Sequence, residues 1–287
     1  MALPELRLAG NVAGDFFVDN TCIDCDLCRQ IAPDSFRQEG EQSIVYRQPS
    51  SAAQELAALK ALVTCPTASI GTLEKKSVAG AVAAFPEQID AEVYFCGFAA
   101  ESSFGGSSYL IVRPDGNVLV DSPRFNNPLA ERIQKMGGVR WMFLTHRDDV
   151  ADHDAWARRF SAERILHRAD AAHLQDRMER LLEGSDPVSL APDLLVIPTP
   201  GHTRGHAALL YRNHFLFSGD HLWWSERYRG LHASRSVNWY SWPEQVRSVR
   251  LLLNYSFEWV LPGHGRRAHA SATEMRRLLQ QCLDRIG

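Results

Sequence analysis

Three cysteines, each separated from the next by two residues, are the feature that most narrows what this chain can fold into. Cys22, Cys25 and Cys28 can direct their thiolates toward one centre. A fourth cysteine, Cys65, lies farther along the chain and is followed by a proline. Disulfide frameworks spread their cysteines over a small secreted domain, so this close spacing predicts metal or cluster ligation instead.

Two kinds of site use four thiolates: an iron–sulfur cluster and a structural zinc ion. Zinc ribbons usually present two separate C-x-x-C pairs, whereas this sequence combines a C-x-x-C-x-x-C run with a distant Cys-Pro. In two-cluster bacterial ferredoxins the run continues to a further cysteine and a proline, but here Ala32 stands at the cysteine position before Pro33. The pattern therefore favours a cluster over zinc, and one cluster over two.

Over about residues 14–72 the sequence resembles the single-cluster [4Fe–4S] ferredoxin family. The resemblance implies a domain that carries electrons, although some clusters of this kind are only structural. The expected ligands of one [4Fe–4S] cluster are Cys22, Cys25, Cys28 and Cys65.

Histidines and aspartates follow apolar runs at four later points of the chain. The segments are 145–153 (THRDDVADH), 199–206 (TPGHTRGH), 218–221 (SGDH) and 261–265 (LPGHG). Because each segment ends an apolar run and contains Gly or Thr, several strand ends can send ligands toward one rim. Imidazoles and carboxylates together suit zinc, iron or manganese.

These four segments occur in the order found in the metallo-β-lactamase superfamily, which the sequence resembles over about residues 93–270. The family motif H-x-H-x-D-H is matched by His146 and by the pair Asp152–His153. Asp148 replaces the second histidine, and two extra residues precede Asp152. The insertion blurs the register, so Asp149 is an alternative ligand to Asp148.

The resemblance implies a two-metal site in which Asp220 bridges the metals. We assign catalytic roles to Asp152 and Asp220. The implied ligands are His146, Asp148 and His202 for the first metal and Asp152, His153 and His264 for the second, with Asp220 shared.

The resemblance implies an enzyme, and two functions from different classes fit it. In the first, two metals activate a water that attacks an ester or thioester, so the protein is a metal-dependent hydrolase. The aspartate at position 220 makes this centre look similar to the glyoxalase II branch. In the second, the cluster feeds a diiron oxidoreductase centre that reduces a small molecule such as oxygen or nitric oxide.

The metals expected at this centre are two divalent ions, zinc or, as the alternative, iron. A carboxylate at position 148 is a harder ligand than histidine and favours iron or manganese. The fusion also raises the effective concentration of an electron donor at its acceptor. In the hydrolase interpretation the fused domain transfers electrons or acts as a sensor.

The 287 residues predict two domains. Residues 1–75 form the ferredoxin-like domain, residues 76–92 are an Ala-rich linker, and residues 93–287 form the second domain. The fold class is α+β, with the small domain followed by a metallo-β-lactamase αββα sandwich. In the second domain we expect a hairpin over 106–121, strands at 139–144, 194–197, 207–211, 214–218 and 257–261, and helices at 127–137, 153–160, 168–183, 243–254 and 271–286.

Composition restricts the partners. A net charge of −3 provides no basic field for nucleic acid or anionic lipid. No stretch approaches the roughly 18 apolar residues of a membrane span, and the first ten residues lack the pattern of a secretory signal. We therefore expect a cytoplasmic protein whose partners are a small-molecule substrate and a redox partner for the cluster.

Several residues lie in or near the motifs without matching family ligands. His206 and His221 are expected to support the ligands rather than bind metal. A group of aromatic residues follows Asp220 and either walls an apolar substrate pocket or packs the two domains or a dimer contact. The group consists of Trp223, Trp224, Tyr228, Trp239, Tyr240 and Trp242.

Overall fold

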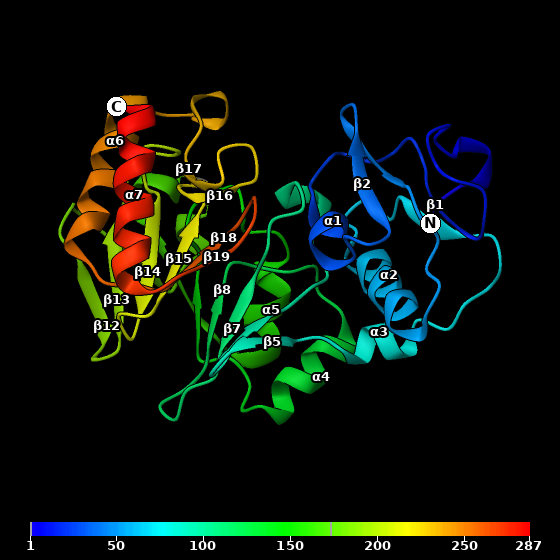
Figure 1. The fold of residues 1–287 in the computed structure, drawn as a ribbon. Helices are drawn as coiled ribbons and strands as arrows, with labels where there is room; N and C mark the ends of the chain where they lie inside the picture. The colour runs from blue at the N-terminus through cyan, green and yellow to red at the C-terminus, as the bar shows by residue number, and fades with distance from the viewer. Residues whose placement is uncertain (1, 173) are drawn as a thin grey trace. The chain divides into compact units, whose positions relative to one another are not determined.

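The computed structural model describes residues 2–172 and 174–287, which divide into two compact units. Unit 1 comprises residues 1–140 and 151–161, and unit 2 comprises residues 141–150 and 162–287. Both units mix helices with strands (Figure 1), so the predicted α+β class is confirmed. No helix in the described part of the chain is long and apolar enough to cross a membrane.

The ferredoxin-like part of unit 1 places two short helices among four strands. Strands β1 and β4 pair antiparallel, and β2 and β3 form a hairpin. Helix α2 begins after Ser51, whose hydroxyl accepts a hydrogen bond from the Gln54 backbone, and it ends where Pro66 prevents its continuation. The bounds are β1 Phe16–Val18, α1 Leu27–Ile31, β2 Phe36–Glu39, β3 Gln42–Val45, α2 Ala52–Thr64 and β4 Ile70–Thr72.

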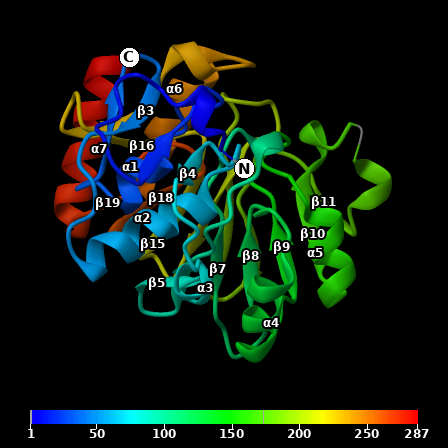
Figure 2. The same cartoon turned by 90° about the vertical axis from the view of Figure 1, so that its right-hand side faces the viewer.

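The rest of unit 1 contains an antiparallel array in the order β8-β7-β6-β5. The predicted hairpin is confirmed, because β7 and β8 pair on either side of Gly116, whose φ of +108° suits glycine (Figure 2). Residues 76–92, expected as a linker, contain α3 and β5, and β5 pairs with β6. The bounds are α3 Ala79–Ala83, β5 Glu87–Asp90, β6 Val93–Phe95, β7 Tyr109–Ile111, β8 Val118–Val120, α4 Asn127–Lys135 and α5 His153–Phe160.

Unit 2 contains parallel strands β9, β10 and β11, and a second sheet in the order β12-β13-β14-β15-β18-β19. Helices α6 and α7 lie side by side in both views (Figures 1 and 2), and their apolar faces bury a core with residues such as Leu216 and Val249. The bounds are β9 Trp141–Phe143, β10 Glu163–His167, β11 Arg180–Leu182, β12 Val188–Ala191, β13 Leu194–Pro198, β14 Ala207–Tyr211, β15 Phe215–Gly219, β16 Trp223–Ser225, β17 Gly230–His232, α6 Trp242–Leu251, β18 Trp259–Pro262, β19 Ala268–His269 and α7 Ala272–Ile286.

One predicted helix, at 168–183, is wrong. Apart from residue 173, which lies outside the described residues, the segment forms two short 3-10 turns and strand β11. Asp170 explains part of the difference, because its carboxylate accepts hydrogen bonds from Thr203 and from the Gly205 backbone, far along the chain. Tertiary bonds of this kind override a local helical pattern.

Candidate functional site

The candidate ligands of unit 2 follow the ends of its strands. His146, Asp148 and Asp149 come after β9, and Asp220 directly follows β15. His202 lies between β13 and β14, and His264 follows β18. Because β14, β15 and β18 are neighbours in one sheet, His202, Asp220 and His264 are brought together although they lie far apart in the sequence.

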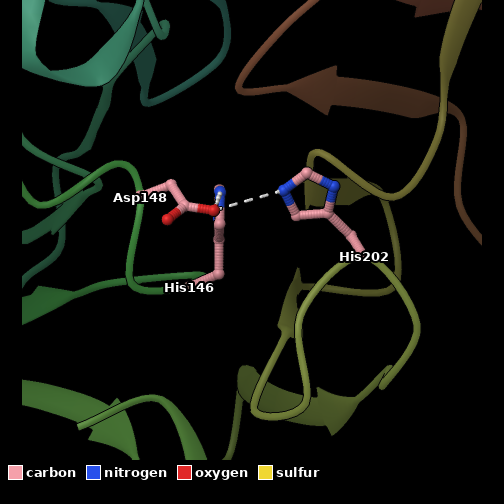
Figure 3. A group of neighbouring side chains, drawn as sticks. All are labelled: His146, Asp148 and His202. Carbon is pink, nitrogen blue, oxygen red and sulfur yellow. Dashed lines mark ion pairs between the residues drawn. The ribbon is translucent and has the colours of Figure 1, made fainter. Parts of the chain in front are cut away.

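The first group of donor atoms consists of two imidazole nitrogens and two carboxylate oxygens. Asp148 Oδ2 lies 3.9 Å from His146 Nε2 and 3.6 Å from His202 Nε2 (Figure 3). Asp220 Oδ2 lies 3.7 Å from His146 Nε2 and 3.6 Å from His202 Nε2. Distances of this size separate the ligands of a single ion that is bound at about 2.0–2.2 Å.

Neighbouring groups fix the orientation of both histidines. His202 Nδ1 donates a hydrogen bond to the Val237 carbonyl at 2.6 Å, and His146 Nδ1 lies 3.0 Å from the Thr145 hydroxyl. Both Nε2 atoms are buried, and neither makes a hydrogen bond with the residues that the structure describes. Two oriented, buried nitrogens that face two carboxylates fit a metal ion, which supplies the partner that each nitrogen needs.

A second group of donors, from Asp149 and His264, also lies next to Asp220. His264 Nδ1 lies 2.8 Å from Asp220 Oδ1 and 3.9 Å from Asp149 Oδ2. Asp149 is 1% exposed, and one of its oxygens joins atoms of His146 and Asp220 within 4.8 Å of one another. The structure therefore brings both Asp148 and Asp149 to the centre, where the sequence had left them as alternatives.

Two glycines allow these side chains to approach the backbone. A Cβ atom at Gly263 would lie 2.5 Å from Asp149 Oδ2 and 2.8 Å from Asp220 Oδ1. A Cβ atom at Gly219 would lie 2.5 Å from His206 Nε2, and the φ of +50° is also unfavourable for other residues. The glycines that precede His264 and Asp220 are therefore required because a larger residue would collide with the side chains of the site.

Protonation states at the centre suit metal binding. Burial lowers the pKa of His146 to about 4, so its imidazole is neutral at pH 7. Burial alone would raise the pKa of Asp220, but the surrounding histidines, His264 foremost, hold it well below its usual range. His202 Nε2, 3.6 Å away, holds the pKa of Asp148 low. Neutral imidazoles and charged carboxylates are the forms that bind metal.

Asp170 is a positioning residue that the sequence did not reveal. Its buried carboxylate accepts hydrogen bonds from the backbone of Arg147 and Gly205 and from the Thr203 hydroxyl. These bonds connect the loop of His146 with the loop of His202. Its position within a segment with a helical pattern gave no signal of this role.

His206 and His221 lie behind the donors, as their positions in the motifs indicated. Both are buried, and their rings lie 5.3 Å apart. The His206 ring is also 5.3 Å from that of His146, and its Nδ1 lies 2.9 Å from the Thr199 hydroxyl. They support the ligand loops through packing.

Asp152 and His153 lie in unit 1, where they begin helix α5. The Asp152 carboxylate accepts a hydrogen bond of 2.7 Å from the Phe125 backbone. His153 is buried, and its Nδ1 lies 3.7 Å from Asp154. Neither belongs to the donor groups described above, so their assignment as ligands stays a prediction.

The aromatic residues after Asp220 divide into two sets. Trp224 and Trp242 pack against the apolar core of unit 2. Trp239 is 61% exposed, and its ring lies 6.2 Å from that of His202. Trp239 thus presents an exposed aromatic ring beside His202, whereas Trp224 and Trp242 contribute to the packing of the core.

The cysteine site of unit 1 holds one buried thiol, Cys28, and three partly exposed ones, Cys22, Cys25 and Cys65. Burial, with smaller contributions from Cys65 and Cys22, raises the pKa of Cys25 to about 12. No three of the four sulfurs lie within 4.8 Å of one another in the described part of the chain, whereas a tetrahedral zinc ion holds its sulfurs about 3.8 Å apart.

Two family models match the sequence. Residues 18–72 match the model described as the 4Fe-4S single cluster domain of ferredoxin I. Residues 90–271, more than half of the chain, match a metallo-β-lactamase superfamily model. The chain belongs to the metallo-β-lactamase superfamily. Both resemblances given by the motifs are thereby confirmed, including the ferredoxin-like iron–sulfur domain that precedes the superfamily domain.

Known proteins of the superfamily resemble this chain to different extents. The uncharacterized protein YobT of Bacillus subtilis is 29% identical over 217 residues, which cover 62% of this chain and 91% of YobT. The hydroxyacylglutathione hydrolase of Acidiphilium cryptum is 32% identical over 121 residues, which cover 40% of this chain and 48% of that enzyme. The metallo-β-lactamase of Hirschia baltica is similar in structure, with a TM-score of 0.52 at 17% identity, over 68% of this chain and 95% of that chain. The predicted metallo-β-lactamase fold is confirmed.

Proposed function

We propose that this chain is a metal-dependent hydrolase in which two divalent metals activate water for attack on an ester or thioester. The observation that carries the proposal is the first donor group, in which two buried histidines and two carboxylates converge at 3.6–3.9 Å. In this proposal His146, Asp148 and His202 would hold the first metal. Asp149 and His264 would hold the second, and Asp220 would be a ligand of both.

Metals held by these residues would supply a water of lowered pKa as nucleophile and would polarise the bond to be attacked. The Asp220 carboxylate is fixed by the backbone N–H of His264, which donates to Oδ1 at 3.0 Å. The Val237 carbonyl fixes the orientation of the His202 ring by accepting a hydrogen bond from Nδ1–H. Residues held in this way need little rearrangement when the substrate reacts.

Substrate reaches the centre from the side of Asp148, whose side chain is 45% exposed while those of His146 and His202 are buried. Trp239 stands beside His202 and offers an apolar surface to the acyl part of an ester or thioester. The relative from Acidiphilium cryptum, named as a hydroxyacylglutathione hydrolase, supports a substrate of this class.

For unit 1 we propose one [4Fe–4S] cluster bound by Cys22, Cys25, Cys28 and Cys65, which transfers electrons or senses redox conditions. The C-x-x-C-x-x-C run with its distant Cys-Pro and the match to the single-cluster ferredoxin model support a cluster. The backbone N–H of Ser43 donates to Cys22 Sγ at 3.4 Å, a contact that stabilises a coordinated thiolate.

A diiron oxidoreductase, supplied with electrons by the cluster, is the second candidate. The observation that favours it is the presence of three carboxylates at the centre, from Asp148, Asp149 and Asp220. Carboxylates are harder ligands than imidazole and suit iron. If this candidate is right, the iron of the His/Asp centre changes oxidation state when reductant and then oxidant are added.

The experiment that separates the candidates is the metal content of anaerobically purified protein. The hydrolase proposal predicts about four irons and about two zincs per chain, together with hydrolysis of an ester or thioester. About six irons, little zinc and no hydrolysis would contradict it and favour oxygen or nitric oxide reduction. Fewer than about four irons, or no acid-labile sulfide, would contradict the cluster.

A further inference from the structure

The cluster cysteines of unit 1 contact a turn from the metallo-β-lactamase part of the same unit. A Cβ atom at Gly105 would lie 2.8 Å from Cys25 Cβ and 3.2 Å from Cys25 Sγ. The same atom would lie 3.2 Å from Pro66, next to Cys65. Gly105 is buried and lies outside the 18–72 range of the ferredoxin-like match. The backbone at residue 105 therefore covers the cluster site where no side chain fits.

The turn is held in a defined conformation. The N–H of Gly105 donates to the Ala100 carbonyl at 2.9 Å, and the N–H of Gly106 donates to the Ser103 carbonyl at 2.8 Å. Gly105 has a φ of +86° and Phe104 a φ of +48°, both in the left-handed region. The shape of this turn is therefore fixed by hydrogen bonds within it, independently of its contact with Cys25.

Two further contacts attach the end of helix α2 to the same part of the chain. The Ala99 N–H donates to the Thr64 carbonyl at 3.1 Å, and the Arg124 guanidinium donates to the Val63 carbonyl at 3.0 Å. These carbonyls belong to the last turn of α2, where carbonyls lack partners within the helix. Cys65 follows directly, so its position depends on Ala99 and Arg124.

We propose that the segment Ala99–Gly106 and Arg124 form part of the iron–sulfur site and shield the cluster from water on the side of Cys25 and Cys65. The ferredoxin-like domain alone then provides the ligands but not the whole environment of the cluster. Solvent exposure and contacts around the ligands set both the lifetime and the potential of such clusters. This inference rests on the proposed cluster and is independent of the reaction at the His/Asp centre.

The experiment uses the full chain, reconstituted anaerobically, with the variant Gly105→Ala. Its matched control is Gly184→Ala, because Gly184 has a similar φ of +82° but nothing within 4 Å of an added Cβ. Iron and sulfide per chain, the rate of cluster loss to an iron chelator and the midpoint potential are measured. We expect Gly105→Ala to lose its cluster about tenfold faster than wild type, the size of effect that overpacking produces, and Gly184→Ala to match wild type.

Arg124→Ala and Arg124→Lys provide a second test that does not depend on the fold of Gly105→Ala. The alanine variant leaves the Val63 carbonyl without its donor, so we expect faster cluster loss and a shifted potential, and lysine should restore part of both. The inference is overturned if Gly105→Ala behaves like Gly184→Ala, or, where Gly105→Ala does not fold, if Arg124→Ala matches wild type. Absence of iron and sulfide from the wild type would overturn the proposed cluster and the inference together.

Discussion

The cysteine site of unit 1 and the His/Asp centre of unit 2 differ in how far apart their ligands lie along the chain. Three of the four cysteines come from one short loop and helix α1. The His/Asp donors come from four loops between residues 146 and 264 and meet only because the strands of unit 2 are assembled. The arrangement of Cys22, Cys25 and Cys28 depends on local chain geometry, whereas the His/Asp centre depends on strands of two sheets.

The largest effect should come from Cys28→Ser. A [4Fe–4S] cluster needs four thiolates, and Cys28 is the most deeply buried of the four, so we expect loss of the iron and sulfide that belong to the cluster. The metals of the His/Asp centre should remain, because they share no ligand with the cluster. Metal and sulfide analysis checks both expectations, with Cys282→Ser as the control, since Cys282 is buried and isolated on α7.

Hydrolysis by the same Cys28→Ser variant sharpens the comparison. If the two regions act independently, kcat/KM for an ester or thioester stays at the wild-type value. A sensory cluster instead predicts that hydrolysis falls when the cluster is lost. Loss of metal from the His/Asp centre in this variant would show that the regions are not independent in folding.

Asp220→Asn should produce the second largest effect. The substitution keeps the shape of the side chain but removes the charge that faces His146, His202 and His264. We expect metal affinity at the His/Asp centre to fall by at least about 100-fold, the upper range for a lost partner of a metal site, while the cluster is unchanged. Titration of chelator-treated protein with zinc measures this, and Asp186→Asn on the surface is the control. Unchanged affinity would remove Asp220 from the proposed centre.

The same contrast explains how much could be predicted from the sequence. The spacing predicts Cys22, Cys25 and Cys28 as ligands, because their chain separation is short enough for one loop and helix α1 to present them, and Cys65 is predicted from the proline that follows it. The four His/Asp segments also predict the superfamily and its fold, since each motif marks the end of a strand. Asp170 and Gly105 could not be found in this way. Their partners, Thr203 and Cys25, are far away in the sequence, and only the assembled chain shows these contacts.

The insertion before Asp152 marks the limit of motif matching. Family order places the second-metal carboxylate at Asp152, but the structure places Asp149 beside Asp220 and His264 and engages Asp152 with the Phe125 backbone. The structure thus offers Asp149 as a second-metal ligand beside the prediction of Asp152. The spacing of residues in a motif does not record how a loop folds around an insertion.

The variants Asp149→Asn and Asp152→Asn decide between these two carboxylates. We expect Asp149→Asn to retain about one of the two metals of the His/Asp centre, because it removes a charged ligand of the second ion. Asp152→Asn should retain both, since an asparagine oxygen still accepts the hydrogen bond from Phe125. Metal content per chain measures the difference. If instead Asp152→Asn loses one metal and Asp149→Asn keeps both, Asp152 is the ligand of the second metal, as the superfamily resemblance implies.

The smallest effect is the dependence of the unfolding free energy on pH. It distinguishes the two regions because the histidines responsible lie in unit 2. Burial lowers the pKa of His146 to about 4 and of His221 to about 3, and it also holds the pKa of His206 well below its usual value. Without metal, the unfolded chain binds protons at these side chains below about pH 6.5, whereas the folded chain does not. Their contribution to stability is therefore complete above that pH and is lost as pH falls toward the folded values.

At about pH 5.5 each of these histidines should lower the free energy of unfolding by about 1 kcal/mol relative to about pH 7.5. Urea unfolding of chelator-treated protein at the two pH values measures the total. His221→Asn removes one of these imidazoles, so the loss of stability between the two pH values should shrink by about 1 kcal/mol in this variant. The Cys28→Ser background should leave the difference unchanged, because the titrating histidines all lie in unit 2. An unfolding free energy that does not fall with pH would mean that these imidazoles can take up protons in the folded protein.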